Sequence, residues 1–378
     1  PRRRAEPLPR RHALDAGPSA VINGPTVATW IGEEIPLVVT FDNTATNPAD
    51  IGYSPFVDIV MPKMGDAPPA PENGVTFKPG SVRYQGQSLQ TTVLTFDAAG
   101  QAVHPFAKKS DGSPVIVPGK AGDQLVVVQL PFGSYAPDQP AIDIDFTGLV
   151  SADAQPNQSY SITATGGFRY QTDPAGNPTV DVATIGATTT DPVQPQLFRI
   201  KKTSNTPEHE TATGPNFTHT YTVSMAVANG QTVTDLLLKD TLPDEVQFVS
   251  LTTVSGNGST TITDISTPTA VTPGGILSRQ FDQVVGTGRD SDVQMSFRYY
   301  VAQKDANGAD VIPLGTGGTT VITNAAQASG KWTSSNPNFP TEQTITIDPA
   351  DPDAQYAITA RSVALQKTFT NLTNPGSP

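Results

Sequence analysis

The sequence predicts an all-β protein of tandem β-sandwich domains, joined by short linkers rich in Pro, Asp and Thr. Three observations predict this fold class. Pro (36) and Gly (32) are abundant among the 378 residues while charged residues make up only 15%, which favours short strands joined by turns. Apolar residues alternate along many short segments, and no run has convincing helical periodicity. A strand with an Asp, a Pro corner and a second strand occurs twice, around Asp58 and Asp240, which indicates repeated domains.

The first domain is expected to be a large sandwich. After an Arg-rich, Pro-broken lead segment, Leu37, Val39 and Phe41 alternate as in a half-buried strand, while Leu125–Leu130 is continuously apolar as in a buried one. Asp97–Gly100 has the composition of a hairpin turn. Strands are expected, in order, at 20–22, 26–30, 35–41, 56–61, 75–84, 89–96, 102–106, 125–130, 141–149 and 160–170.

A second domain follows a linker-like stretch, and a third is expected to begin after an acidic one. The Lys-Thr pairs at Lys202 and Lys367 lie 367 − 202 = 165 residues apart, a period that indicates tandem whole domains. The expected segments are 1–18 (extended N-terminal segment), 19–187 (large sandwich), 188–196 (linker), 197–347 (sandwich repeat), 348–354 (acidic linker) and 355–378 (start of a third, truncated repeat). Because the chain begins with Pro and ends in what looks like mid-domain, we expect a processed chain or a fragment.

Composition excludes several classes of protein. The absence of Cys excludes disulfides and thiolate metal sites. The net charge of −12 argues against nucleic acid as a partner, and no apolar run approaches the ~20 residues that would span a membrane. The four His form no metalloprotease motif, and there is neither a nucleophile elbow nor a phosphate loop, so no enzyme acting on a substrate is expected.

Four motifs of the second domain occur in the order of a known repeat. These are Lys202-Thr203, Tyr221-Thr222-Val223, Asp240-Thr241-Leu242-Pro243 and Thr323-Asn324-Ala325-Ala326. They resemble the repeats called domain of unknown function eleven. The resemblance implies an immunoglobulin-like sandwich from a large bacterial extracellular or surface protein, over residues 197–347. The first domain matches the pattern only in part, through the strand from Asp58 to Pro62.

Three polar residues of the second domain share the parity of apolar neighbours. Lys202 alternates with Ile200, and Asp240 and Asn324 likewise follow the apolar face of their strands, so all three are expected to point into the core. One interpretation is a buried Lys–Asp ion pair with Asn324 bonded to the backbone. The other is an intramolecular isopeptide bond, in which Lys202 attacks Asn324 while Asp240 transfers the proton. The first domain keeps Asp58 but lacks both Lys and Asn.

Calcium is the one cofactor that the sequence brings into question. Asp305, Asn307 and Asp310 space oxygen ligands around a Gly, although the distal Glu of a calcium loop is missing and a hairpin turn explains the pattern as well. The linker carboxylates of Asp348, Asp351 and Asp353 offer a second set of ligands between domains. The alternative is that they form a solvated acidic linker.

Together these observations predict a secreted protein of the bacterial cell surface or extracellular matrix. Its tandem sandwiches would act as spacers, or as adhesive subunits of a surface layer or filament, with copies of itself or neighbouring repeats as partners. The alternative is a module that binds surface glycans or a host surface through the loops at 43–54 and 63–73 of the first domain. Of the aromatic residues that such binding uses, those loops contain only Tyr53.

Overall fold

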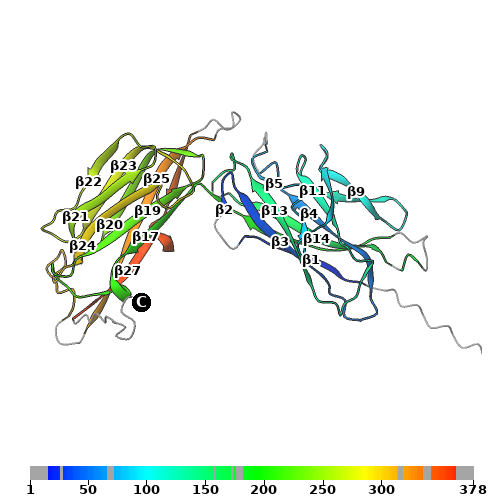
Figure 1. The fold of residues 1–378 in the computed structure, drawn as a ribbon, viewed down its shortest axis with the longest axis horizontal. Coiled ribbons are helices and arrows are strands. Elements are labelled where there is room, and N and C mark those ends of the chain that lie inside the picture. The colour runs from blue at the N-terminus through cyan, green and yellow to red at the C-terminus, as the bar shows by residue number, and fades with distance from the viewer. Residues whose placement is uncertain are drawn as a thin grey trace, which may run out of the picture. The chain divides into compact units, whose positions relative to one another are not determined.

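The computed structural model describes residues 16–25, 29–65, 72–156, 158–171, 173–175, 182–313, 318–334 and 342–362. Within these ranges the chain is all-β, which confirms the predicted fold class, and apart from strands it contains only two single-turn 3₁₀ helices. It divides between Gln196 and Leu197 into two compact units (Figure 1). No helix of the described residues is long and apolar enough to cross a membrane.

The first unit places two six-stranded sheets around its core. One has the order β1-β3-β13-β6-β7 with β5 paired to β13, and the other the order β15-β14-β4-β11-β8 with β12 paired to β4. The smaller pairs are β10-β9 and β16-β2. The strands are β1 (Pro18–Asn23), β2 (Thr29–Trp30), β3 (Glu34–Asn43), β4 (Gly52–Met61), β5 (Val75–Phe77), β6 (Arg83–Tyr84), β7 (Gln87–Ser88), β8 (Gln90–Thr95), β9 (Gln101–Lys108), β10 (Pro114–Pro118), β11 (Gln124–Gln129), β12 (Ser134–Tyr135), β13 (Ile142–Val150), β14 (Tyr160–Tyr170), β15 (Thr184–Val193) and β16 (Pro195–Gln196).

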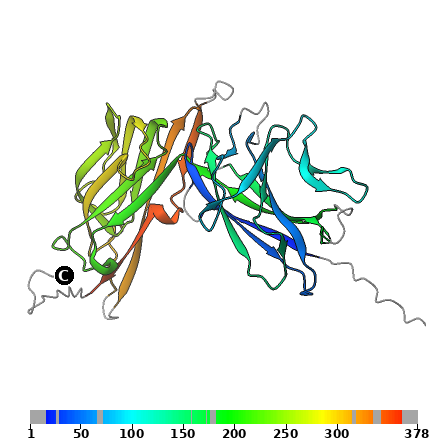
Figure 2. The ribbon, with the colours of Figure 1, turned by 45° about the vertical axis from the view of Figure 1, so that its right-hand side comes forward.

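The second unit consists of a four-stranded and a seven-stranded sheet, seen from two angles in Figures 1 and 2. The smaller sheet has the order β17-β19-β24-β21. The larger has the order β18-β27-β25-β20-β23-β22, with β26 paired to β25. The strands are β17 (Phe198–Ser204), β18 (Glu210–Thr211), β19 (His219–Val227), β20 (Thr232–Leu242), β21 (Val246–Gly256), β22 (Ile262–Ser266), β23 (Gly275–Val285), β24 (Val293–Val301), β25 (Thr319–Trp332), β26 (Gln343–Ile347) and β27 (Gln355–Arg361).

The stretch expected to be a linker at 188–196 is instead part of the first unit. Residues 184–193 form β15, which pairs antiparallel with β14, and β16 pairs in parallel with β2. The Thr-rich composition that resembled a linker fits a strand whose side chains are mostly exposed, because Thr favours strands and tolerates solvent.

Residues 355–361 do not begin a third repeat. They form β27, which pairs antiparallel with β25 and in parallel with β18 in the larger sheet of the second unit. The preceding acidic stretch is a tight turn in which the Asp351 carboxylate accepts a hydrogen bond from the amide of Asp353 at the start of a 3₁₀ helix (Pro352–Ala354). A Pro- and Asp-rich turn between two strands of one sheet has the composition of an inter-domain linker, and only the strand pairing separates the two. Lys367 lies outside the described residues.

The turn at Asp97–Gly100 does not join two paired strands. Its Asp97 carboxylate accepts hydrogen bonds from the amides of Ala99 and Gln101, as expected for a turn. However, β8 before it pairs with β11, whereas β9 after it pairs with β10. The turn therefore leads the chain from the sheet into a separate hairpin. The residues of the turn do not determine which strands pair on either side of it.

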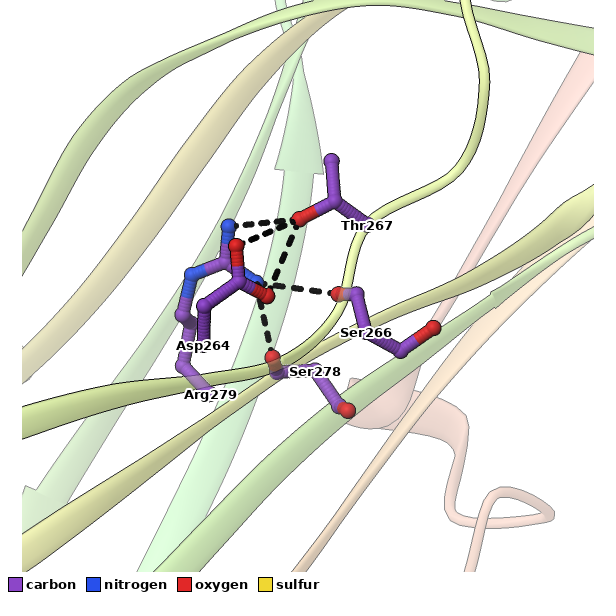
Figure 3. A network of polar contacts seen from close by, with 5 residues as sticks. All are labelled: Asp264, Ser266, Thr267, Ser278 and Arg279. Atoms are coloured by element: carbon purple, nitrogen blue, oxygen red, sulfur yellow. Dashed lines mark hydrogen bonds and ion pairs between the residues drawn. The ribbon is translucent and has the colours of Figure 1, made fainter.

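A buried arginine binds the end of the edge strand in the larger sheet of the second unit. β22 pairs only with β23, and a bulge interrupts this pairing between Asp264 and Ser266. Arg279 of β23, 5% exposed, donates to the Asp264 carboxylate at 2.8 Å and to the carbonyl of Ser266 at 2.9 Å (Figure 3). It also donates to the Thr267 hydroxyl at 2.9 Å. Arg279 therefore holds the bulged end of β22 against β23.

Candidate functional site: a buried Lys–Asp–Asn triad

Lys202, Asp240 and Asn324 meet in the core of the second unit. Lys202 projects from β17 of the smaller sheet, and Asp240 and Asn324 project from β20 and β25 of the larger one. Their exposed fractions are 4%, 0% and 0%. The parity argument therefore placed all three side chains on the correct face of their strands, because successive side chains alternate between faces.

Strand register explains why Asp240 and Asn324 are neighbours. Asp240 lies directly opposite Ala326 on the adjacent strand, so Asn324, two residues away on the same face, is its diagonal neighbour. Diagonal pairs of this kind have Cα atoms about 7–8 Å apart, within reach of polar side chains that lean toward each other. Lys202 reaches them from the opposite sheet, and its ammonium nitrogen is hydrogen-bonded to Asp240 Oδ2.

The surroundings of Lys202 are aromatic. Its Nζ lies 4.6 Å from the centre of the Tyr221 ring and 5.7 Å from that of Phe297. Tyr221 stacks on Tyr299 with ring centres 3.8 Å apart, and the Tyr299 hydroxyl makes 2.8 Å hydrogen bonds with Ser204 and Thr206. These rings leave the side chains of Lys202 and Asp240 with no solvent exposure.

Burial changes the ionisation of both members of the pair. It lowers the pKa of Lys202, an effect that the charge and hydrogen bond of Asp240 oppose. It raises the pKa of Asp240, which the charge and hydrogen bond of Lys202 and the amide of Asn324 oppose. Both shifts disfavour the charged forms, so burial moves the pair toward a neutral amine next to a protonated carboxyl.

Three polar atoms at this site lack a hydrogen bond of normal geometry. They are Oδ1 of Asp240 and both polar atoms of the Asn324 amide. A buried polar atom without a partner costs about 1–3 kcal/mol, and native cores rarely leave one, still less three in one place. This cluster of unpaired atoms is the feature that calls for a chemical explanation.

The first unit contains a different buried pair, which the sequence did not reveal and which lies where β4 packs against the β9 hairpin rather than between the two large sheets. Asp58 is 5% exposed, and its Oδ1 lies 3.1 Å from Nε2 of His104, which is also buried. Nδ1 of His104 accepts a hydrogen bond from the amide of Ala107 at 2.8 Å, so the ring proton is on Nε2 and is donated to Asp58. Asp58 lies opposite Thr165 on β14. Thr163, two residues before Thr165, therefore has the same register relative to Asp58 as Asn324 of β25 has relative to Asp240.

The residues considered for calcium have other partners. The Asp305 carboxylate accepts hydrogen bonds from the amides of Asn307 and Ala309 within a hairpin turn, and Asp310 pairs with Lys304 at 2.8 Å. Asp348 and Asp351 each accept a hydrogen bond from a nearby backbone amide. The described residues contain no group of three or more His, Cys, Asp or Glu placed to hold a metal ion.

The loops considered for glycan binding give little support to that alternative. Tyr53, the aromatic residue expected on the first loop, lies in β4, opposite Ser134 on one side and Tyr170 on the other. Residues 66–71 of the second loop lie outside the described residues.

Comparison with known proteins adds only distant likenesses. No protein-family model matches the chain, and no curated protein matches it. Among solved structures it is similar to the C-terminal domain of the AgI/II polypeptide BspA of Streptococcus agalactiae, at 9% identity and a TM-score of 0.26 over 91% of this chain and 99% of that one. It is also similar to a 35 kDa C-terminal fragment of the major pilin GBS80 of the same species, at 12% identity and a TM-score of 0.29 over 89% and 93%.

An enzyme is among the similar structures as well. AvmM, which catalyses macrocyclization in alchivemycin A biosynthesis, is 12% identical with a TM-score of 0.26 over 48% of this chain and 90% of that one. The chain thus resembles bacterial adhesin and pilin domains, and in part an enzyme, without being assigned by these likenesses to any family or function.

Proposed function

We propose that the second unit crosslinks itself by an amide bond between Lys202 and Asn324, and that the chain is a structural segment of a bacterial extracellular or surface protein. The observation that supports this proposal is the cluster of unpaired polar atoms around a fully buried Lys–Asp pair. The amide product has one N–H donor and one carbonyl acceptor. The protonated oxygen of Asp240 could donate to that carbonyl, and the other oxygen of Asp240 could accept from that N–H. Condensation would therefore give hydrogen-bond partners to atoms that are otherwise unpaired.

The reaction is a transamidation that needs no added reactant. The neutral Nζ of Lys202 attacks Cγ of Asn324 and forms a new C–N bond. Asp240 takes a proton from Nζ and returns a proton to Nδ2, after which the Cγ–Nδ2 bond breaks and ammonia leaves. Burial supports this step, because it disfavours the ammonium form of Lys202 and the carboxylate form of Asp240.

The product would join the two sheets covalently. Lys202 belongs to the first strand of the unit and Asn324 to β25 of the facing sheet, so the bond closes a loop of more than a hundred residues. In a chain without Cys, such a bond would take the part that disulfides have in other extracellular proteins. This fits a spacer or a subunit of a fibre or surface layer, in which copies of the chain are the partners.

Intact mass tests the crosslink directly. We expect the purified chain to be lighter than its sequence by one ammonia, about 17 Da, and its tryptic digest to contain a branched peptide that joins β17 to β25. Lys202→Arg and Asn324→Ala variants should have their full sequence masses. A wild-type chain of full sequence mass would overturn the proposal. A loss of about 18 Da would indicate condensation of Lys202 with Asp240 and contradict the assignment of Asn324.

A further inference from the structure

A strand outside the triad lies directly against it. Tyr356 of β27 is the partner of Asn324 in the antiparallel pairing of β25 and β27. Directly opposite residues of an antiparallel pair point to the same face, so the Tyr356 side chain lies beside the Asn324 amide on the face toward the core. The burial of Ile358 and Ala360, which share this parity, shows that the same face of β27 is packed inside the unit.

Tyr356 connects the triad to the aromatic side chains around Lys202. Its ring meets the Tyr221 ring edge-on at 6.0 Å, and Tyr221 is the ring that lies 4.6 Å from Nζ of Lys202. On its other side Tyr356 stacks against His209 at 4.8 Å with an angle of 14° between the planes. Tyr356 therefore lies between a surface histidine and the aromatic side chains that surround Lys202.

β27 is held in place by contacts with elements distant in the sequence. It pairs along its length with β25, and over only two residues with β18. An ion pair between Glu210 and Arg361 and a 3.3 Å contact between His209 Nδ1 and the carbonyl of Ala357 complete the attachment. All three members of the triad precede β27 in the chain, so they are synthesised before the strand that covers them.

We propose that docking of β27 controls the crosslink, with Tyr356 as the positioning residue. This inference rests on the proposed amide bond between Lys202 and Asn324. Before β27 docks, the edge of β25 is open at Asn324, water reaches the triad and Lys202 keeps its proton. Once Tyr356 lies against Asn324 and Tyr221, the amine is desolvated and neutral, and the amide is held at the position of attack.

The pH dependence of crosslinking separates this role from a merely structural one. The reactive state has a neutral amine and a protonated carboxyl. The crosslinking rate therefore falls at low pH, where the amine is protonated, and at high pH, where the carboxyl is ionised. Removing the Tyr356 ring hydrates Lys202, which moves the low-pH limb of the profile to higher pH. The titratable groups of the described residues around this site are Asp240 on β20, Tyr221 on β19, Tyr299 on β24, Tyr356 itself and His209, which stacks on the Tyr356 ring.

The experiment follows ammonia loss by intact mass in full chains that are isolated in urea, before folding, and then diluted into buffers of different pH. We expect Tyr356→Ala to slow crosslinking about tenfold or more, because an Asn324 amide that is no longer held at the position of attack loses most of the rate gain from correct positioning. We also expect the low-pH limb of the rate profile to move to higher pH. Tyr356→Phe, which keeps the ring, should stay within about twofold of the wild type. Ile358→Asp, which places a charge in the buried face of β27, should nearly abolish the reaction, while Ala357→Asp on the exposed face should not.

Circular dichroism and the fluorescence of the buried Trp332 verify that each variant has folded. If Ile358→Asp does not fold, the two Tyr356 variants decide the question. Wild-type rates in Tyr356→Ala, or slowing without a shift of the pH profile, would overturn the role of β27 and leave the crosslink standing. A wild-type chain that never loses ammonia would overturn the crosslink and this inference together.

Discussion

At the scale of the residue, the second unit depends on how the charge of Lys202 is compensated. Both side chains of the Lys202–Asp240 pair have no solvent exposure, so neither charge retains hydration. Removing one partner of a buried pair leaves an uncompensated charge, whereas replacing both with apolar side chains of similar volume is often neutral. Substitutions at these two positions should therefore have effects that are far from additive.

We expect Asp240→Ala to lower the free energy of unfolding of the second unit by about 3–5 kcal/mol relative to Asn324→Ala, which cannot crosslink but keeps the ion pair. The double substitution Lys202→Met, Asp240→Leu should recover most of this loss. Urea denaturation followed by Trp332 fluorescence in a Trp30→Phe background measures the second unit alone, because the chain has only these two Trp. A cost below about 1 kcal/mol for Asp240→Ala would contradict the role of the pair.

At the scale of the element, the edge strand β22 is the least protected part of the larger sheet. Its side chains are almost all exposed and it pairs with a single neighbour. Arg279 compensates by donating three hydrogen bonds to Asp264, Ser266 and Thr267 of the β22 edge (Figure 3). The guanidinium also donates to the carbonyl of Ser278 on β23 at 2.7 Å, so one buried cation has acceptors on both strands of this edge pair.

We expect Arg279→Met to release β22 and to destabilise the second unit by about 1–3 kcal/mol, because carbonyl and carboxylate acceptors lose their donor. Hydrogen exchange should show loss of protection confined to β22 and the adjoining part of β23. Arg298→Met is the matched control, since Arg298 is an exposed residue of β24 in the same unit. Equal effects of the two substitutions would refute the assigned role of Arg279.

At the scale of the whole molecule, two compact units share one strategy with different chemistry. Each contains a buried Asp hydrogen-bonded to a side-chain nitrogen, Nζ of Lys202 in the second unit and Nε2 of His104 in the first. Only the second unit adds an amide that can be attacked. We therefore expect covalent stabilisation in one unit and ordinary non-covalent stability in the other.

Metal removal tests whether calcium contributes to either unit. Because the carboxylates of Asp305 and Asp310 are engaged with backbone amides and Lys304, we expect the Tm of both units to be the same in millimolar calcium and in EDTA. Differential scanning calorimetry measures both transitions in one experiment. A calcium-dependent rise in Tm that Asp305→Asn or Asp351→Asn removes would instead identify the turn or the 348–354 segment as a metal site.

The order of residues was enough to predict the fold class and the face of each strand on which the triad residues lie. Side chains alternate strictly along a strand, so the apolar parity around Lys202, Asp240 and Asn324 was sufficient to place all three in the core. Strand composition was likewise sufficient to predict an all-β chain. Both properties depend only on residues that are close together in the chain, so the sequence is sufficient to predict them.

Which strands belong together follows from long-range packing and was visible only in three dimensions. The tertiary structure assigned β15 to the first unit and β27 to the second, although the flanking residues have linker composition. It also supplied His104 as the partner of Asp58 and Tyr356 as the neighbour of Asn324. These contacts join residues between 16 and 46 positions apart, and such pairings depend on the packing of the whole unit rather than on any local pattern.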